Sequence, residues 1–280
     1  MSTFNGWKYY KHAVVPDVAP DVNVDTSCIE SGEVWKCKDG EVILARWTTD
    51  FDCGYETNWW YEIKDTVFDI NSLPSKKRYK INRGHKHFDV RLIDPKEYKQ
   101  DIYDVQVDAY KDYPAKYRPF VDKDKVYAII DNDWKRANVK IYAAFEKESG
   151  RMAGYIQLDL SGNCIESIAQ KAKPEFEKFQ VNYAMLHKVI EDHNESISKG
   201  CYICVGARNI QHETAFQQFV EEIFDFRKAY CKLHVEYNPK YKWIIKLIYP
   251  FRRIIKCFDD IGIVHKVNGI LAMEEIVRTQ

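Results

Sequence analysis

A histidine and two other polar residues follow an apolar segment in the second half of the chain. Residues 201–207 read CYICVGA, and Arg208, Asn209 and His212 come directly after them. The segment is typical of a buried strand, and clefts form at the C-terminal ends of strands in open α/β sheets. In such a cleft His212 could take a proton from a nucleophile, while Arg208 and Asn209 bind the substrate. The alternative is that these side chains only cap the following helix.

A basic segment in the first half of the chain is a second candidate for ligand binding. Residues 73–84 read LPSKKRYKINRG, and Gly84 predicts the C-terminal end of a helix. Lys77, Arg78 and Arg83 of this helix are candidates for binding a polyanion, because the chain as a whole has no net charge. The alternative is a solvated basic face, packed against the protein only by its tyrosine and isoleucine.

Glu166 and Asn182 are two further site candidates. Glu166 belongs to a predicted strand at 165–169 and is a second candidate base. Asn182 lies at the start of a predicted helix at 179–194, where it would either cap the helix or contact the substrate.

Two residue pairs have the spacing of metal ligands. His85 and His87 form an H-x-H pair, but no third ligand is evident. Cys201 and Cys204 form a C-x-x-C pair inside the apolar segment, whereas a thioredoxin-like role requires this motif at a helix start. We therefore predict neither a metal site nor a redox site.

The composition is that of a folded protein with balanced charge. The 280 residues suffice for one large domain or two small ones, and 45% of them are hydrophobic. The 42 basic and 42 acidic side chains give no overall case for nucleic-acid binding. We see neither the apolar run of a signal peptide nor the roughly 20 apolar residues of a transmembrane helix. With eight dispersed cysteines, this predicts a cytoplasmic protein with reduced thiols.

Residues 1–70 are predicted to be rich in short strands. The Asp39-Gly40 pair is a hairpin signal between two of them. The predicted elements of the first half are strands at 33–37, 41–47 and 58–63, the basic helix with a strand at about 90–92, and a helix at 95–113.

The second half has a more regular pattern. Its predicted elements are strands at 139–145, 152–160 and 165–169, a helix at 179–194, a strand at 202–205, a helix at 214–224 and a strand at 230–237. In the first of these helices, Val181, Ala184, Met185 and Val189 lie on one face. The order β-β-β-α-β-α-β predicts an α+β (mixed α/β) fold.

This order, with the turn GRMAG at 150–154, resembles the core of the GNAT acyltransferase fold over residues 90–237. Ala215 and Phe226 match the last helix of that fold. The basic helix that leads directly into a strand resembles the Fem-type peptidyltransferases, where a Lys/Arg-Tyr-x-Ile-x-Arg helix precedes the second of two GNAT-like folds. The resemblance implies a twisted mixed sheet flanked by helices. It also implies acyl or aminoacyl transfer to an amine of a cell-envelope or polysaccharide precursor.

Two departures from the GNAT pattern bear on the donor. GNAT enzymes hold the pyrophosphate of coenzyme A at a Gly-rich turn that opens the central helix. The matching residues 173–182 contain no glycine, and the carboxylates of Glu175 and Glu177 would repel phosphate. The tyrosine that often serves as general acid is replaced by Phe219. The expected donor is therefore an acyl-CoA in a non-standard pose or, as in Fem-type enzymes, an aminoacyl-tRNA. The competing hypothesis is a non-catalytic scaffold or binding protein that has lost donor binding.

The C-terminal residues 240–258, KYKWIIKLIYPFRRIIKCF, interleave basic with large apolar side chains. Such a pattern is typical of a helix lying in a membrane interface, and Pro250 should kink it. This interpretation predicts peripheral association with the inner face of a membrane, where a lipid-linked precursor would be found. The alternative is a helix packed on the domain with its basic side chains in water. The predicted domains are a β-rich N-terminal extension (1–70), a GNAT-like core (71–238) and a C-terminal helical segment (239–280).

Overall fold

A computed structural model of the chain shows a mixed α+β protein made of two compact units. It describes residues 3–4, 6–113, 118–133, 138–210 and 215–280. The first unit comprises Met1–Glu62, Ala207–Phe219 and Arg227–Gln280, and the second comprises Ile63–Gly206 and Val220–Phe226. The chain passes between the units within β5 (Trp59–Lys64), β10 (Tyr202–Ala207) and α7 (Ala215–Phe224).

The sheet of the first unit has the strand order β1-β2-β3-β4-β11-β5. Its other strands are β1 (Thr3–Phe4), β2 (Trp7–Tyr10), β3 (Ala13–Pro16), β4 (Leu44–Thr49) and β11 (Arg227–Tyr237). β3 pairs in parallel with β4, whereas β4 and β11 pair antiparallel from Leu44↔Tyr237 to Thr49↔Lys232. The predicted strands at 58–63 and 230–237 are therefore confirmed, and the one predicted at 41–47 begins at Leu44.

The strand predicted at 33–37 is wrong. Glu33–Lys36 form a 3-10 helix, η1, after α1 (Ser27–Glu30), and Gly32 reverses the chain between them with φ 75°. Val34 is fully buried in a cluster with Trp7 and Val14. Packing in this cluster outweighs the strand propensity of the segment, as tertiary contacts commonly do.

The C-terminal segment of the first unit is helical, as predicted. It consists of α8 (Pro239–Ile248), η4 (Tyr249–Phe251), α9 (Arg252–Lys256) and α10 (Gly262–Arg278). Pro250 lies in η4, where the helical path is interrupted. Ile245 of α8 and Met273 of α10 are buried in a cluster with Leu44 of β4 and Tyr237 of β11. Within the described part of the chain, no helix combines the length and the apolar composition that a membrane crossing requires.

The sheet of the second unit has the strand order β10-β9-β8-β7-β6. Its other strands are β6 (Phe88–Ile93), β7 (Val139–Glu146), β8 (Met152–Ser161) and β9 (Cys164–Ala172). β6 to β9 pair antiparallel, and β10 pairs in parallel with β9. With α6 (Val181–Ser198) between β9 and β10, the predicted order β-β-β-α-β-α-β is confirmed.

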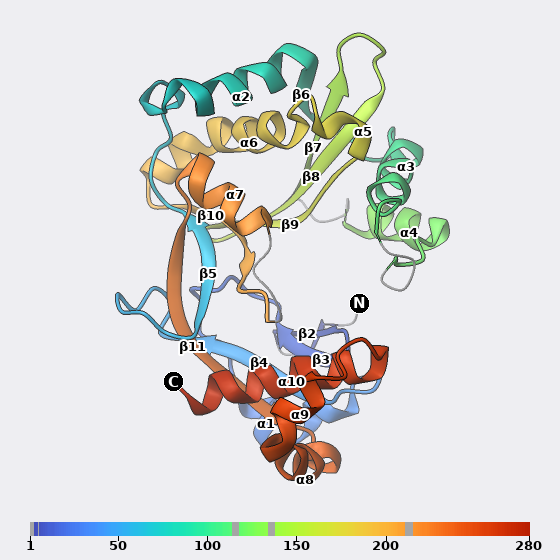
Figure 1. Cartoon of the computed structure of the whole chain (residues 1–280), viewed down its shortest axis with the longest axis vertical. Coiled ribbons are helices and arrows are strands. Elements are labelled where there is room, and N and C mark those ends of the chain that lie inside the picture. Colours follow the sequence, from blue (N-terminus) through green and yellow to red (C-terminus); the bar gives the residue numbers. More distant parts are fainter. Residues whose placement is uncertain (1–2, 5, 114–117, 134–137, 211–214) are drawn as a thin grey trace. The chain divides into compact units, whose positions relative to one another are not determined.

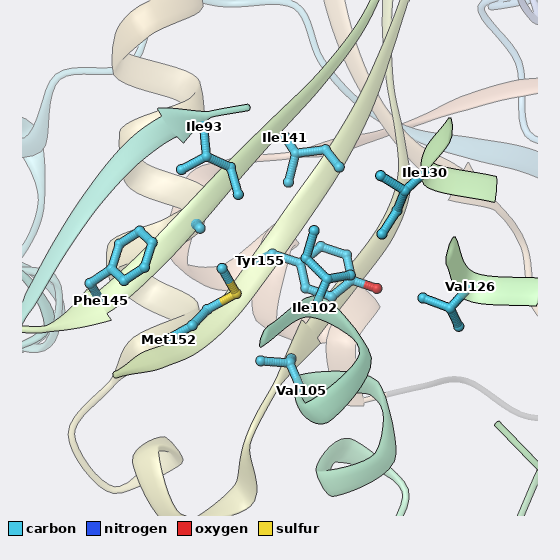
Figure 2. Close-up of a cluster of buried hydrophobic side chains, with 10 residues drawn as sticks. Ile93, Ile102, Val105, Val126, Ile130, Ile141, Phe145, Met152 and Tyr155 are labelled. Atoms are coloured by element: carbon cyan, nitrogen blue, oxygen red, sulfur yellow. The ribbon is translucent and has the colours of Figure 1, made fainter. Parts of the chain in front are cut away.

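Helices cover both faces of this second sheet. α6 packs on β6, β7 and β8, and α2 (Ser75–His87) packs on α6 (Figure 1). On the other face, α3 (Lys99–Ala109) and α4 (Lys123–Asp133) bury Ile102, Val105, Val126 and Ile130 against the strands (Figure 2). Successive residues of β8 point to opposite faces of the sheet: Gly154 meets Met185 of α6, whereas Tyr155 belongs to the cluster with α3. The remaining short elements are η2 (Ile70–Ser72) and α5 (Pro174–Glu177).

The helix end predicted at Gly84 is wrong, because α2 continues to His87. Gly84 lies where α2 meets the start of α6. A Cβ atom added at Gly84 would lie 2.6 Å from the carbonyl oxygen of Gln180 and 3.0 Å from the Cβ atom of Ala184. Glycine at this position therefore permits the close approach of two helices and does not end one.

Candidate functional site

The parallel strands β9 and β10 remain paired over only three residues. The register joins Tyr202–Cys204 of β10 to Cys164–Glu166 of β9. Both strands continue beyond this point, to Ala207 and Ala172. Past Glu166 and Cys204, no register joins their facing edges in the described structure. Backbone N–H and C=O groups on those edges must find other partners, and a ligand can supply them.

A β-bulge lies just past the point where the two strands separate. Ser167 pairs with Leu158 of β8 and Ala169 pairs with Gln157, so Ile168 is the extra residue. A bulge leaves its extra residue outside the ladder and re-aims the side chains that follow. The β9 backbone at Ile168 is consequently a candidate donor to an oxyanion that forms between the strands.

Glu166 occupies the last paired position of β9, opposite Cys204. Its side chain is partly buried, and its backbone lies where the two strands begin to separate. The Cys204 thiol has a raised pKa, first through a hydrogen bond with Cys164 and then through burial. Cys204 therefore neighbours Cys164 across the two strands, while Cys201 lies before β10 begins.

The bulge turns Gln170 toward α6. Without an extra residue, Gln170 would share a face with Glu166; instead its Nε2 donates a hydrogen bond of 2.9 Å to Oδ1 of Asn182. The buried Oε1 of Gln170 accepts no hydrogen bond from any residue that the structure describes. Asn182 thus lies beside the split through Gln170, and the residue at the cap position of α6 is Gln180. Sequence reasoning missed Gln170, because only the bulge gives it this direction.

The start of α6 is closely covered on one side. Besides the approach of Gly84, Phe176 of α5 packs perpendicular to Phe88, with ring centroids 5.8 Å apart. Glu175 pairs with Arg151 at 3.3 Å, so one of the two carboxylates of this turn is partly neutralised. α2 therefore lies against one side of a helix N-terminus that an anion could otherwise approach.

The three predicted substrate-binding residues of α2 differ in what they contact. Lys77 donates a hydrogen bond from Nζ to the carbonyl oxygen of Glu222, and Arg78 donates one of 3.2 Å to the carbonyl oxygen of Asn71. Arg83 makes no ion pair or hydrogen bond with the described residues. Of the three, Arg83 is therefore the side chain that remains for a ligand.

Arg208 and Asn209 belong to the first unit. The guanidinium of Arg208 lies 4.7 Å from the ring centroid of Trp60 and donates a hydrogen bond of 2.5 Å to the carbonyl oxygen of Asn58. Asn209 bonds Gln217 at 3.4 Å. His212 lies outside the described residues. The structure thus joins Gln170 to Asn182 on the α6 face of the sheet, leaves Glu166 on the opposite face of β9, and places Arg208 and Asn209 in local contacts of the other unit.

The histidines of the predicted H-x-H pair point to different partners. His85 shares a hydrogen bond with His187, and His87 stacks on Phe179 at 4.7 Å between ring centroids. Among the described residues, no three His, Cys, Asp or Glu side chains gather as ligands for a metal ion.

Comparisons with known proteins complete the description of the fold. No protein-family model and no curated protein matches the chain. In contrast, solved structures are similar over most of its length. The structure of FemX has a TM-score of 0.55 at 10% identity, with 85% of each chain covered.

Two further structures share this likeness. L-PGS from Bacillus licheniformis has a TM-score of 0.50 at 11% identity, over 86% of this chain and 83% of that one. A conserved protein of unknown function from Bacteroides thetaiotaomicron has a TM-score of 0.51 at 11% identity, over 80% and 78%. The strand order and these likenesses together show that the chain has a GNAT-like fold, in the form shared with the structure of FemX.

Proposed function

We propose that the protein is a transferase of the GNAT/Fem type, which moves an acyl or aminoacyl group to an amine of a cell-envelope or polysaccharide precursor. The observation that carries this proposal is the split between β9 and β10, with Glu166 at its closed end and the bulge at Ile168 beyond it. The split brings Glu166 and the bulged backbone of β9 to the place where the two strands separate. The acceptor class rests on the likeness to Fem-type proteins alone.

Each part of the split has a role in acyl transfer. The acceptor amine must lose a proton before its lone pair attacks the donor carbonyl, and Glu166 can take that proton directly or through water. The carbonyl oxygen then becomes an oxyanion, which a backbone N–H near Ile168 can stabilise. The intermediate then collapses as its bond to the donor sulfur or ribose oxygen breaks, and that atom leaves as the thiol or hydroxyl with the proton that Glu166 had taken up. His212 remains the alternative base.

The donor that fits best is an aminoacyl-tRNA. Arg83 supplies a positive charge without a described partner, and α2 lies against the start of α6. A donor held through a long polyanion does not need the helix N-terminus that coenzyme A uses in GNAT enzymes.

The experiment measures transfer of a radiolabel from aminoacyl-tRNA, or from acetyl-CoA, to nucleotide-linked sugar-peptide precursors that carry a free amine. Glu166→Gln keeps the size of the side chain and removes the base, so we expect the rate to fall about 100-fold or more. Glu148→Gln, on the exposed turn between β7 and β8, is the matched control and should keep the rate of the wild type. An unchanged rate in Glu166→Gln would exclude Glu166 as the base, and His212→Gln would then test the alternative.

A non-catalytic binding protein is the second candidate function. Phe219 stands at the position where GNAT enzymes often have a tyrosine as general acid. Its ring lies tilted against that of Phe216, with centroids 6.1 Å apart, and has no proton to give. If aminoacyl-tRNA binds the wild type but no label reaches any amine acceptor, this second function is the correct one.

A further inference from the structure

The C-terminal helices of the first unit expose a continuous row of large apolar side chains. Trp243, Leu247, Phe251, Ile254 and Phe258, which we call the outward stripe, are each between 55% and 63% exposed. Trp243 and Leu247 lie one turn apart on α8, Phe251 ends η4, Ile254 lies on α9, and Phe258 follows α9 directly. Large apolar side chains that follow one another in this way are unusual on a protein surface without a partner.

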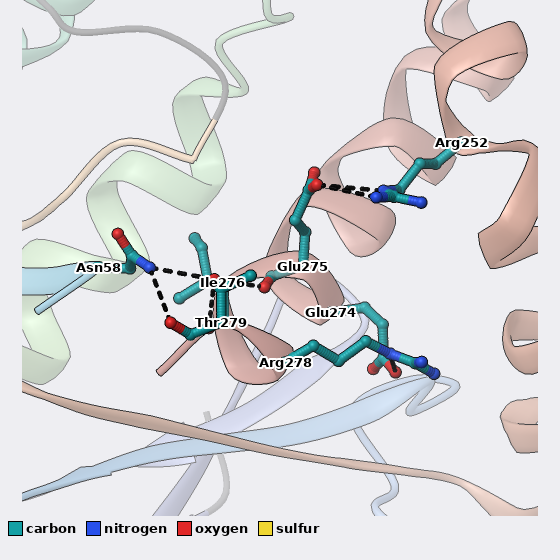
Figure 3. Close-up of polar contacts among 7 residues, drawn as sticks. All are labelled: Asn58, Arg252, Glu274, Glu275, Ile276, Arg278 and Thr279. Atoms are coloured by element: carbon teal, nitrogen blue, oxygen red, sulfur yellow. Dashed lines mark hydrogen bonds and ion pairs between the residues drawn. The ribbon is translucent and has the colours of Figure 1, made fainter.

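The opposite side of the same segment is firmly attached to the unit. Ile245 is buried in the core cluster with Leu44, Tyr237 and Met273. Arg252 bonds Glu275 at 3.1 Å (Figure 3), and its guanidinium lies 4.4 Å from the ring centroid of Tyr249.

The far end of the helical segment is held in the same way. The guanidinium of Arg278 also lies over the Tyr249 ring, 4.2 Å from its centroid. Asn58 holds the end of α10 through a hydrogen bond of 3.0 Å to Thr279 (Figure 3). The segment is therefore attached to the unit through Ile245, Tyr249, Arg252 and the end of α10, whereas the side chains of the outward stripe remain more than half exposed. The alternative expected from the sequence, with the apolar side chains packed on the domain, holds for Ile245 and does not hold for the stripe.

Positive charges without partners accompany the outward stripe. Lys242 is paired with Glu236 and Arg252 with Glu275. In contrast, Lys240, Lys246 and Arg253 make no ion pair with any described residue. An apolar row with unpaired cations beside it is complementary to a surface that is apolar inside and anionic at its boundary.

We infer that the outward stripe docks the protein on an anionic lipid bilayer. Trp243, Leu247 and Phe251 would enter the boundary between head groups and acyl chains, and Lys246 and Arg253 would bind lipid phosphates. A tryptophan suits this depth, because its ring is apolar and its N–H can stay hydrogen-bonded. A second copy of the chain is the competing occupant. A twofold interface on this stripe would, however, bring Lys246 and Arg253 close to their own copies.

This docking is independent of the proposed reaction, because it uses no residue of the split between β9 and β10. The test therefore needs no substrate. It measures co-sedimentation of the full chain with vesicles of phosphatidylglycerol and phosphatidylcholine, and with vesicles of phosphatidylcholine alone, at low and at high salt.

Two double variants probe the two components of the interaction. Leu247→Ser with Ile254→Ser removes apolar area, and Lys246→Glu with Arg253→Glu reverses the charge. Each is expected to lower the partition onto anionic vesicles at least tenfold. The matched controls are Val67→Ser with Ile129→Ser, at positions 56% and 53% exposed, and Lys36→Glu with Lys38→Glu on the exposed surface of the first unit. Both controls should bind vesicles as the wild type does.

A second measurement locates the tryptophan. Lipids brominated on the acyl chain should quench part of the fluorescence of the wild type and less of that of Trp243→Phe. Equal binding to neutral and anionic vesicles, or wild-type binding by both stripe variants, would overturn the inference. So would a dimer in sedimentation analysis that the Leu247→Ser, Ile254→Ser variant abolishes, with no binding to vesicles.

Discussion

Nε2 of His85 on α2 and Nδ1 of His187 on α6 share a hydrogen bond of 2.9 Å. The pair joins the basic helix to the central helix of the second unit, and the ring of Phe68 packs perpendicular to His187 at 5.8 Å between centroids. A hydrogen bond between two imidazoles requires that at least one ring be neutral. Burial, followed by the neighbouring His85, lowers the pKa of His187 to about 4, and burial also lowers the pKa of His85.

We predict that the protein loses stability when the pH falls below about 6.5. In the unfolded chain these histidines take up protons near their ordinary pKa of 6.5, whereas the folded protein resists protonation. The unfolded state therefore binds more protons as the pH falls, and stability present above about pH 6.5 is lost toward about pH 4. The positive charges of Lys188 and Lys147 also lower the pKa values of these histidines, and the negative charge of Glu191 raises them.

Urea denaturation at several pH values measures the effect. We expect the wild type to lose about 1–2 kcal/mol over this pH range from His187. His187→Gln should show a smaller dependence on pH, because its side chain does not titrate. The same slope in this variant and in the wild type would mean that other groups cause the pH dependence.

The second prediction concerns the contact between α2 and α6. Gly84→Ala should destabilise the protein by about 1–2 kcal/mol, because the added methyl group meets the backbone of Gln180 at 2.6 Å. In an unobstructed helix interior, the same change would stabilise by roughly 0.5–1 kcal/mol. Thermal unfolding of the variant measures the difference.

Gly262→Ala is the matched control for this prediction. Gly262 is the first residue of α10, and an added Cβ atom would meet nothing within 4 Å. Its unfolding temperature should stay the same or rise slightly. If Gly84→Ala were as stable as this control, the two helices would not be in close contact.

The strands of the second unit and its central helix could be predicted from the sequence, because each carries its own periodicity. Val181, Ala184, Met185 and Val189 are all buried on the inner side of α6, as their spacing indicated. The alternating strands 139–145 and 152–160 lie within β7 and β8 for the same reason. Local patterns of this kind do not depend on distant parts of the chain.

The parts that could not be predicted depend on contacts between distant residues. A glycine at position 84 indicates a helix end when the sequence is read alone. Only the approach of α6 explains why glycine is needed there and why α2 continues past it. The bulge at Ile168 has no sequence signal, yet it directs Gln170 to Asn182. Likewise, the 3-10 turn that contains Val34 forms because a cluster from other strands buries it.

The third prediction separates ligand binding from structure on α2. Arg83→Ala should lower the salt slope of tRNA binding by about one and leave the unfolding temperature unchanged, because Arg83 has no described partner in the folded protein. Lys77→Ala should instead lower the unfolding temperature, because it removes the hydrogen bond to the carbonyl oxygen of Glu222. Filter binding at several salt concentrations and thermal unfolding measure the two effects. Wild-type tRNA binding by Arg83→Ala at every salt concentration would assign α2 a structural role only.

The last prediction concerns the donor. Acetyl-CoA should bind with a dissociation constant weaker than about 1 mM in isothermal titration. Two features could weaken the binding of acetyl-CoA: repulsion of phosphate by the carboxylates of Glu175 and Glu177, and the approach of Gly84 to Gln180 at the start of α6. They make different forecasts for Glu175→Gln with Glu177→Gln, which removes the negative charge and leaves the helices in place. We expect no gain in affinity, because Glu175 already pairs with Arg151 and α2 still lies against the start of α6, where a pyrophosphate would otherwise approach. A large gain would identify repulsion as the cause, and micromolar binding by the wild type would show that another surface of the protein holds coenzyme A.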